Sequence, residues 1–435
     1  MKPETRFMLT GVGAAAQTAN ALRPVARTGR LSVPAFAFGL TPSELPIPTA
    51  MFELATVALT ARNGGARGWR GKVGLAAHLA SLAGLAKLHR DARRTADLVE
   101  AALEEALGAD YRSRIREPFT PKTEVALTRR QLLMPDMRKR KRYRADRDIA
   151  YGEFGRRNRL DVWKRRDLPA DAKAPVLFQV HGGAWVMGMK EGQAEPLMAH
   201  LAERGWVCVA PNYRLAPRAT WPELVVDLKK ALAWTKATIA EHGGDPDFVA
   251  ITGGSAGGHL ASLIALTPHV KEFQPGFEEV DTSVVAAVPF YGVYDFVNRH
   301  GTSRADMEDF LAKNLFKSRR ADDRARWEQA STISHVGAHA PPFFVLHGTN
   351  DSLVPVEQAR TFVDELRKVS SQPVAYAELP GAQHAFEIFP SIRADASAHA
   401  VERFLAVLRS EHGGETPAEA VSGHTIASSS ERALV

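Results

Sequence analysis

The stretch Phe248-Val-Ala-Ile-Thr-Gly-Gly-Ser255-Ala-Gly-Gly-His-Leu-Ala-Ser-Leu-Ile-Ala-Leu266 determines the fold that this sequence predicts. It begins with an apolar run typical of a buried strand, Phe248–Thr252, and ends with a helix-like run, His259–Leu266. Between them Gly253 to Gly257 match the pattern G-x-S-x-G. A strand, a tight turn and a helix in this order are typical of a nucleophile elbow, which exposes the Ser255 hydroxyl at the carboxyl edge of a sheet.

Strand-like runs alternate with helix-like stretches from about residue 149 onward. The run Pro175–Val180 is almost entirely apolar, which is typical of a strand covered on both faces. Helical stretches include Glu223–His242 and Glu357–Lys368. This alternation predicts an α/β fold with a mostly parallel central sheet and helices on both faces. The predicted strands are Leu160–Trp163, Pro175–Val180, Val207–Ala210, Phe248–Thr252, Val284–Tyr291, Phe343–His347 and Val374–Leu379.

Two residues further along the chain suit the partners that a reactive serine needs. A serine hydroxyl is a weak nucleophile, so it requires a base that is held in turn by a carboxylate. In this architecture the chain order is serine, then acid, then histidine. Asp351 and His384 each follow a predicted strand, so we expect both side chains at the same sheet edge as Ser255. Asp295 is the alternative acid, and His259 is expected to pack or to form hydrogen bonds beside the turn.

The loop His181-Gly-Gly-Ala-Trp185 follows the predicted strand Pro175–Val180. A tetrahedral intermediate of acyl transfer carries an oxyanion, which needs backbone N–H groups that already point at it. The small residues of this loop allow its amides to point inward, and Ala256 offers a further amide directly after the serine. The loop and the turn together are therefore candidates for an oxyanion hole.

With five motifs in one order, the chain resembles the hormone-sensitive-lipase-like family of the α/β-hydrolases. Its N-terminal extension makes it most similar to actinobacterial lipase and carboxylesterase members, and the resemblance covers about residues 150–410. The motifs are Val180-His-Gly-Gly-Ala-Trp185, Asn212-Tyr-Arg-Leu-Ala-Pro217, Gly253-Gly-Ser-Ala-Gly-Gly258, His347 to Pro355 and Gly381 to Phe386.

This resemblance implies a serine carboxylesterase or lipase that acts through an acyl-enzyme intermediate on short to medium acyl chains, without a metal or an organic cofactor. The substrate would be a small-molecule or lipid ester. The family's catalytic roles fall on Ser255 as nucleophile, Asp351 as orienting acid and His384 as base. The family's oxyanion amides fall on Gly183, Ala184 and Ala256, while Gly182 helps to shape the loop and His181 braces it.

Two departures from the family pattern concern the substrate. Ala184 replaces the common third glycine of the oxyanion loop, which we expect to leave its amide usable but to narrow the acyl entrance. Arg218 replaces the acidic residue that usually follows Leu-Ala-Pro217, and nothing in the sequence explains it. The loop His181–Trp185 also resembles that of arylformamidases, so an amide hydrolase such as an arylformamidase or an N-deacetylase is the alternative activity. A binding protein on an inactive hydrolase fold is a further alternative.

The remaining segments suggest a cap and two termini outside the hydrolase domain. Four prolines between residues 34 and 48 predict irregular structure over residues 1–50. Helices are expected at 51–61, 73–89 and 91–109, which would form part of a cap over the site. An insert at about 298–336, with apolar Phe310, Leu311, Leu315 and Phe316, would supply the rest. The predicted divisions are an N-terminal helical region, 1–140, the catalytic domain, 141–412, and a disordered tail, 413–435.

The charge of the chain is distributed unevenly. Residues 1–166 carry 32 Lys and Arg against 16 Asp and Glu, whereas residues 167–435 carry 24 against 33. Residues 129–166 alone have a net charge of +10 and contain the run Arg138-Lys-Arg-Lys-Arg142. No nucleic-acid-binding module accompanies this run, so nucleic acid is not expected as a partner. A solvated linker is the simplest interpretation, and attraction to an anionic membrane or envelope surface is the alternative.

The composition fits a folded soluble protein. The chain has 435 residues, 45% of them apolar, and a single cysteine, Cys208, which excludes an internal disulfide and a cysteine-based zinc site. Its apolar neighbours predict that Cys208 is a buried small hydrophobe. We expect neither a cleaved signal peptide nor a membrane-spanning helix, so the predicted location is the cytoplasm or the periphery of the membrane or envelope.

Overall fold

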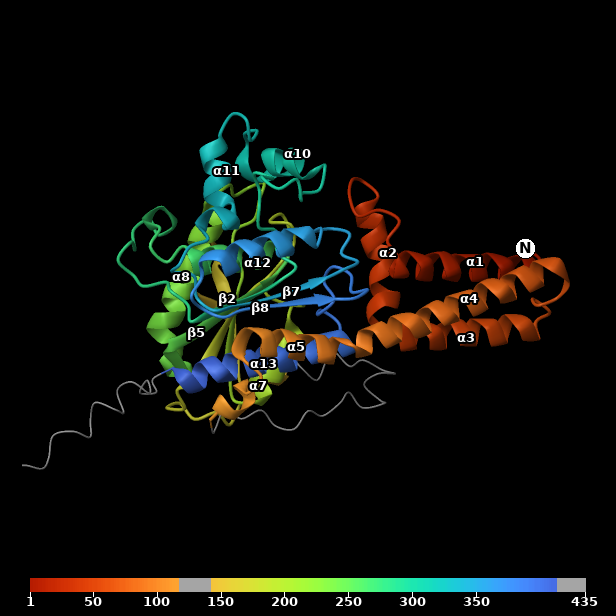
Figure 1. The fold of residues 1–435 in the computed structure, drawn as a ribbon, viewed down its shortest axis with the longest axis horizontal. Helices are drawn as coiled ribbons and strands as arrows, with labels where there is room; N and C mark the ends of the chain where they lie inside the picture. Colours follow the sequence, from red (N-terminus) through yellow and green to blue (C-terminus); the bar gives the residue numbers. More distant parts are fainter. Residues whose placement is uncertain (117–141, 413–435) are drawn as a thin grey trace, which may run out of the picture.

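The computed structural model describes residues 1–116 and 142–412, which build an eight-stranded sheet surrounded by helices (Figure 1). The strand order is β1-β2-β4-β3-β5-β6-β7-β8. The strands from β4 onward along this order pair in parallel, whereas β2 is antiparallel to both β1 and β4. The strands are β1 Arg144–Ala150, β2 Arg159–Trp163, β3 Ala174–Val180, β4 Val207–Pro211, β5 Gly244–Gly254, β6 Ala286–Phe290, β7 Phe343–Gly348 and β8 Val374–Leu379.

The seven predicted strands are all present, and the mostly parallel α/β architecture is confirmed. The prediction missed β1, which carries Arg144, Asp146, Arg147 and Asp148 and lies at the sheet edge, where it pairs with β2 alone. Charged residues suit an exposed edge because they discourage pairing with another chain. Because of these charged residues, β1 lacks the apolar run from which the other strands were predicted.

Helices cover both faces of the sheet. On one face lie α8 (Glu223–Thr238), α9 (Ala256–Leu266) and α12 (Glu357–Val369), and on the other α5 (Thr95–Leu107), α7 (Glu195–Glu203) and α13 (Ile392–Glu411). Neighbouring residues of one strand serve different faces, as expected from the two-residue period of a strand. Leu177 of β3 packs on the face that α5, α7 and α13 cover, and Phe178 packs on the face that α8, α9 and α12 cover.

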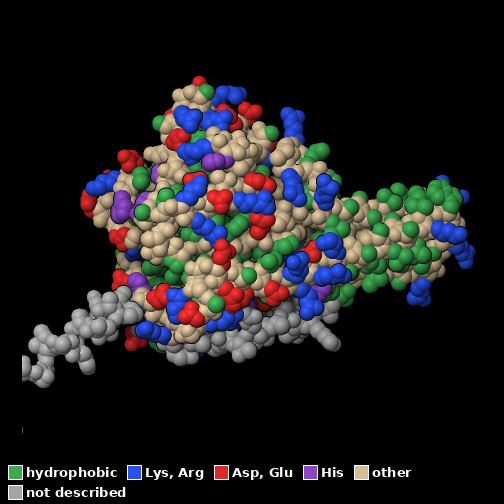
Figure 2. All heavy atoms as spheres, in the orientation of Figure 1, with side chains coloured by type: hydrophobic (Ala, Val, Ile, Leu, Met, Phe, Trp, Pro, Cys, Tyr) green, Lys and Arg blue, Asp and Glu red, His purple; other side chains and the backbone are tan. Residues whose placement is uncertain are grey.

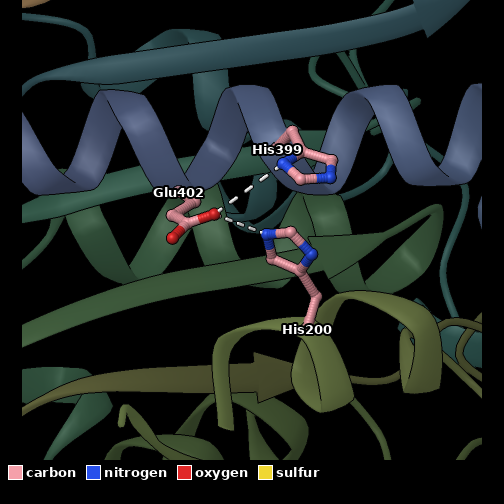
Figure 3. A group of neighbouring side chains, drawn as sticks. All are labelled: His200, His399 and Glu402. Carbon is pink, nitrogen blue, oxygen red and sulfur yellow. Dashed lines mark hydrogen bonds and ion pairs between the residues drawn. The ribbon is translucent and has the colours of Figure 1, made fainter. Parts of the chain in front are cut away.

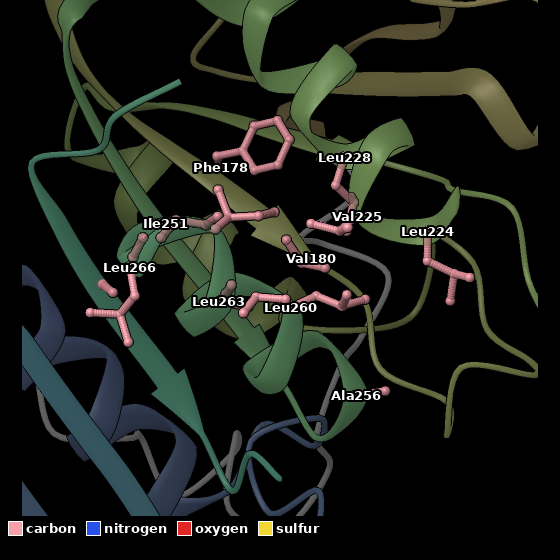
Figure 4. Packing of buried hydrophobic residues seen from close by; sticks show 14 of the residues in the cluster. Phe178, Val180, Leu224, Val225, Leu228, Ile251, Ala256, Leu260, Leu263 and Leu266 are labelled. Atoms are coloured by element: carbon pink, nitrogen blue, oxygen red, sulfur yellow. The ribbon is translucent and has the colours of Figure 1, made fainter. Parts of the chain in front are cut away.

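The packing of α8 and α9 against the sheet fixes the turn that carries Ser255. Figure 4 shows fully buried side chains of both helices meeting those of β3 and β5. Because α9 begins directly after Ser255, this core holds the start of the helix close to the end of β5. The labelled residues are Phe178, Val180, Leu224, Val225, Leu228, Ile251, Ala256, Leu260, Leu263 and Leu266.

The segment between β6 and β7 forms a small helical layer, part of which packs against α9. It contains α10 (Met307–Leu311), a π-turn (Ala312–Phe316), α11 (Arg324–Ala330) and a 3-10 turn (Thr332–His335). The predicted apolar face is largely buried: Leu311, Leu315 and Phe316 are fully buried and Phe310 packs beside them. Phe316 stacks on Trp327 at 4.3 Å between ring centroids, which joins the two halves of the layer. Further 3-10 turns span Tyr111–Arg114, Gly155–Asn158, Ile239–His242 and Lys271–Phe273.

The expectation of irregular structure over residues 1–50 is wrong. Helix α1 spans Pro3–Leu22 and α2 spans Ser32–Glu44, and they are followed by α3 (Pro46–Arg62) and α4 (Gly68–Arg93). Pro3 and Pro46 each begin a helix, where the missing N–H has no intrahelical partner in any case. Of the four prolines that suggested irregular structure, Pro34, Pro46 and Pro48 lie in the first turn of a helix, and Pro42 lies inside α2 near its end.

Helices α1, α3 and α4 pack together as an arm that projects from the part of the molecule that contains the sheet (Figure 1). The predicted helices at 51–61 and 73–89 belong to α3 and α4 of this arm. The third predicted helix, α5, packs instead against β8 and α13. No helix within residues 1–116 and 142–412 combines the length and the hydropathy that crossing a bilayer requires. The predicted tail and all of the basic run except Arg142 lie outside the described residues.

Candidate active site

Ser255 lies in a strained turn between β5 and α9. Its φ of 60° and ψ of −123° fall outside the regions that residues with a side chain commonly occupy. Two glycines make the turn possible. A Cβ on Gly253 would stand 2.5 Å from the Gly257 carbonyl oxygen, and a Cβ on Gly257 would stand 2.1 Å from that of Val180. The turn is anchored by the Ser255 N–H, which donates to the Phe290 carbonyl at 3.0 Å.

Asp351 and His384 lie together at the ends of β7 and β8. His384 Nδ1 and Asp351 Oδ2 are 2.7 Å apart, and both side chains are buried. The N–H groups of Leu353 and Val354 both donate to Asp351 Oδ1 at 2.8 Å, which fixes the carboxylate. Burial disfavours the charged carboxylate, but the His384 charge and hydrogen bonds from His347 and His384 outweigh it, so the pKa of Asp351 lies below its ordinary value.

Tyr291 connects the histidine to the serine turn. The centroid of its ring lies 4.5 Å from that of the His384 ring. Its hydroxyl packs so closely on Gly254 that a Cβ placed on this glycine would stand 2.6 Å from it. Both parts of the candidate site therefore contact one side chain at the end of β6. No hydrogen bond joins Ser255 to His384, both of which the structure describes. Such bonds are often long in free enzymes and tighten when substrate binds.

The loop after β3 runs beside the serine. A Cβ on Gly182 would stand 3.3 Å from Ser255 Cβ, so this part of the loop touches the elbow. Gly183 and Ala184 have φ values of 122° and 49°, which turn the chain sharply. The Gly182 N–H donates to Gln193 Oε1 at 2.6 Å, so this amide is already engaged. Among the described residues, no hydrogen bond engages the amides of Gly183, Ala184 or Ala256, which leaves them available to a ligand.

His181 braces this loop from within. It is fully buried, its ring stacks on Tyr213 at 4.3 Å, and its carbonyl accepts a hydrogen bond from the Tyr213 hydroxyl at 2.8 Å. Burial lowers the pKa of His181 to about 4, so the ring is neutral at pH 7. A neutral, enclosed ring suits a packing role and not that of a base.

His259 is equally enclosed. Its Nδ1 accepts a hydrogen bond from the Trp185 indole at 3.1 Å, and its Nε2 lies 2.7 Å from the Ala330 carbonyl. Burial lowers its pKa to about 4. These contacts tie the oxyanion loop to the helical layer between β6 and β7, in agreement with the expected role in packing and hydrogen bonding.

Asp295, the alternative acid, takes part in a different set of contacts. Its carboxylate accepts from the Arg299 N–H at 2.5 Å and lies 3.4 Å from the Ser331 hydroxyl. Both partners belong to the segment between β6 and β7. Of the two candidate acids, Asp351 is the one that lies against His384.

A second histidine and carboxylate cluster joins α7 to α13 (Figure 3). His200 Nε2 and Glu402 Oε2 are 2.7 Å apart, and His399 Nδ1 lies 3.9 Å from the same oxygen. Donor atoms of these types can hold a metal ion. However, Arg204 Nε lies 2.8 Å from Glu402 Oε2, so a cation already neutralises this carboxylate. The arrangement suits a buried ion-pair cluster that fastens the two helices.

Sequence reasoning missed three side chains around the site: Phe36, Gln193 and Tyr291. Phe36 comes from a segment expected to be irregular, yet its ring meets that of His384 edge-on at 5.9 Å. Gln193 holds Gly182 from eleven residues away. Tyr291 stands at the end of a predicted strand, a position from which a side chain can reach the site, so its location was a usable signal.

Comparison with known proteins shows the family to which the chain belongs. A family model described as BD-FAE matches residues 160–366. The probable carboxylic ester hydrolase LipM of Mycobacterium tuberculosis is 52% identical over 413 residues, which cover 94% of both chains. The chain belongs to the carboxylic ester hydrolases. Esterase LipQ of the same organism is 46% identical to this hydrolase over 319 residues. The match covers 73% of this chain and 76% of LipQ.

Solved structures resemble part of the hydrolase chain. The butyrate-bound esterase Est2 of Thermogutta terrifontis is 26% identical, with a TM-score of 0.50, and covers 60% of this chain and 92% of its own. A truncated carbohydrate esterase from gut microbiota has a TM-score of 0.51 at 19% identity, a likeness of fold alone. The match to LipM extends further than either, so it includes most of the N-terminal helical region.

Proposed function

We propose that this ester hydrolase works through a serine nucleophile, Ser255, with His384 as base and Asp351 as the acid that orients it. The 2.7 Å contact between His384 Nδ1 and Asp351 Oδ2 carries this proposal. A proton held on Nδ1 by the carboxylate leaves Nε2 free to accept the serine proton. The strained backbone of Ser255 supports the role of nucleophile, since it presents the hydroxyl at the end of β5.

The reaction follows from these positions. Ser255 Oγ attacks the ester carbonyl carbon while His384 Nε2 takes its proton, and the carbonyl oxygen becomes an oxyanion. The amides of Gly183, Ala184 and Ala256 donate to that oxygen, and one such donor contributes about 3–4 kcal/mol. His384 then protonates the leaving alcohol. Water activated by the same histidine attacks the acyl-enzyme and releases the acid.

Gly182 has a separate part in this mechanism. Because its N–H is engaged by Gln193, it shapes the loop and does not donate to the oxyanion. His181 supports the loop from the other side through its contacts with Tyr213. The donors are thus fixed before substrate arrives, which is the condition under which they stabilise a transition state most.

The acyl group is of short to medium length. Ala184, in place of the family's common third glycine, adds a methyl group to the oxyanion loop, and the buried Trp185 follows it. A butyrate-bound structure of the related Thermogutta terrifontis esterase supports the lower end of this range.

The basic N-terminal part also holds the enzyme peripherally at an anionic membrane or envelope surface. The net charge of +10 over residues 129–166 supports this location.

Substitution of the nucleophile tests the mechanism. Ser255→Ala is expected to abolish hydrolysis of p-nitrophenyl butyrate and labelling by a fluorophosphonate probe, with an unchanged circular dichroism spectrum. Ser262→Ala is the matched control, because Ser262 lies two turns further along α9 and its hydroxyl donates to the Gly258 carbonyl. Full activity of Ser255→Ala would exclude the proposal. Faster cleavage of an acyl anilide than of the matching phenyl ester would favour the amide alternative.

A further inference from the structure

The arm of α1, α3 and α4 has a polar interior. Glu53 of α3 is buried between α4 residues: its carboxylate lies 2.7 Å from His78 Nδ1 and accepts from the Ser81 hydroxyl at 2.8 Å. The hydroxyls of Ser81 and Thr18 are 2.9 Å apart, which adds α1 to the network. Few apolar side chains are buried where these three helices meet. Burial of the arm's own apolar surface therefore does little to hold it together.

Glycines bring the helices of the arm into close contact. A Cβ on Gly11 of α1 would stand 2.5 Å from the Gly74 carbonyl oxygen of α4, and a Cβ on Gly84 would stand 2.5 Å from Thr18 Cγ2. Small residues at helix contacts, together with hydrogen bonds between helices, are typical of helix pairs surrounded by lipid. In that environment packing and hydrogen bonding, and not hydrophobic burial, hold helices together.

The outer surface of the arm is apolar. Three long stretches of the arm are almost free of charged residues: 7–22, 46–61 and 73–86. Glu53 is the one Asp, Glu, Lys or Arg residue among them, and it is buried. Figure 2 shows hydrophobic side chains over the visible face of the arm, with basic side chains towards its tip and base. The exposed apolar residues include Leu9, Val12, Met51, Phe52, Leu54, Leu59, Trp69, Val73, Leu75 and Leu79. This distribution is the reverse of that in a helical bundle surrounded by water.

We propose that the arm inserts into the surface of an anionic phospholipid bilayer. An apolar surface of this extent marks an interaction site, and the acyl chains of a bilayer can cover it. The tip supplies charge complementarity to lipid phosphates. It carries Arg62, Arg67, Arg70 and Lys72, with the exposed Trp69 among them, a residue type enriched at membrane interfaces.

The two ends of the arm define its orientation. The uncharged stretch 73–86 of α4 is 14 residues long, or about 21 Å at the rise of an α-helix, which is shorter than a hydrocarbon core of about 30 Å. Basic residues flank it on both sides, Lys72 before and Lys87 after. An arm that lies along the membrane surface keeps both ends at the headgroups of one leaflet.

The base of the arm reaches the candidate active site. The Asn350 amide donates to the carbonyls of Ala21 and Leu22 at 2.9 and 3.0 Å, and the Ser352 hydroxyl donates to the Ser32 carbonyl. These contacts tie α1 and α2 to the loop that carries Asp351. An enzyme held in this way meets esters that reside in the membrane. The proposal rests on the ester hydrolase mechanism above, and it assigns medium-chain esters that reside in a bilayer as a substrate class.

Flotation of the full chain with vesicles tests the proposal. The vesicles contain phosphatidylcholine and phosphatidylglycerol and carry p-nitrophenyl laurate. The variant Leu59→Gln with Leu79→Gln changes two residues that are 64% and 58% exposed. We expect it to lower vesicle binding and laurate hydrolysis by about 10-fold, because two apolar contacts with lipid are lost. Hydrolysis of dissolved p-nitrophenyl butyrate should stay within about twofold of the parent value, since the catalytic residues are untouched.

Two controls make the result specific. Val280→Gln with Val369→Gln changes exposed apolar residues of the catalytic domain and should behave as the parent. Leu59→Trp with Leu79→Trp keeps the arm apolar and should bind vesicles at least as well. Binding by the Gln variant equal to that of the parent would overturn the proposal. So would a parent protein that forms oligomers through the arm and ignores vesicles. Loss of butyrate hydrolysis by Ser255→Ala alone tests the mechanism independently.

Discussion

The ring of Phe36 meets the ring of His384 edge-on, with 5.9 Å between their centroids. Phe36 belongs to α2, about 350 residues from the histidine in sequence. Gly39 of the same helix lies close to Gln383, the neighbour of His384. A Cβ placed on Gly39 would stand 3.5 Å from the side-chain amide nitrogen of Gln383. The N-terminal region is thus part of the surroundings of the proposed base.

Phe36→Ala should weaken catalysis. The substitution removes an aromatic contact of about 0.5–1.5 kcal/mol with the His384 ring, which corresponds to a fall in kcat/KM of about 2- to 10-fold. Steady-state kinetics with p-nitrophenyl butyrate measure the effect. Phe38→Ala is the matched control, since Phe38 lies on the same helix but is exposed. Equal kinetics for both variants would mean that α2 does not position the histidine.

Asp351→Asn separates the two candidate acids. An amide at position 351 cannot hold the proton of His384 on Nδ1, so kcat should fall by about 1,000- to 10,000-fold. Asp295→Asn keeps an acceptor for the Arg299 N–H and should retain activity within about fivefold. Rates for both variants at saturating p-nitrophenyl butyrate check the prediction. The reverse order of rates would assign the role to Asp295.

The sequence predicted the parts of the fold that consist of apolar strands and glycine turns. Both leave strong local signals: β3 and β5 are buried runs, and Gly253 and Gly257 stand where a Cβ would collide with the backbone. The positions of Asp351 and His384 followed from the order of strands, because the carboxyl ends of parallel strands share one edge. Contacts such as that between Phe36 and His384 depend on tertiary packing, and no local pattern reports them.

The N-terminal arm shows why another part of the fold was missed. Prediction of a surface helix relies on an apolar face that turns inward, whereas here Glu53, His78 and Ser81 turn inward and leucines turn outward. The apolar pattern of α4 is also interrupted by the glycines that bring it close to α1. The sequence therefore predicted two helices of the arm, but not that they form an arm with α1 or that its interior is polar.

Ala184→Gly should widen the acyl entrance. Ala184 has a φ of 49°, a conformation that glycine adopts without strain. Relief of strain and the greater flexibility of glycine in the unfolded chain oppose each other, so the free energy of unfolding should change by less than about 1 kcal/mol. The ratio of kcat/KM for a branched acyl ester to that for the acetate should rise by about 3- to 10-fold. An unchanged ratio would show that the methyl group does not border the acyl group.

Glu387→Gln should change how stability depends on pH. Burial raises the pKa of Glu387 to about 7, and the hydrogen bond with Tyr291 and the His384 charge offset only part of this effect. Between the ordinary value of 4.5 and about 7, the native protein binds more protons at this group than the unfolded chain does. The contribution of Glu387 to stability is therefore greatest at low pH and declines as pH rises through this range.

A glutamine does not titrate, so the variant avoids this decline. Its free energy of unfolding should exceed that of the parent by about 3 kcal/mol at pH 8 and by less than about 1 kcal/mol at pH 5. Urea unfolding at the two pH values measures both differences. Glu272→Gln, at an exposed position, is the matched control and should match the parent at both. A difference for Glu387→Gln that is the same at pH 5 and pH 8 would show that the Glu387 carboxyl does not titrate in this range.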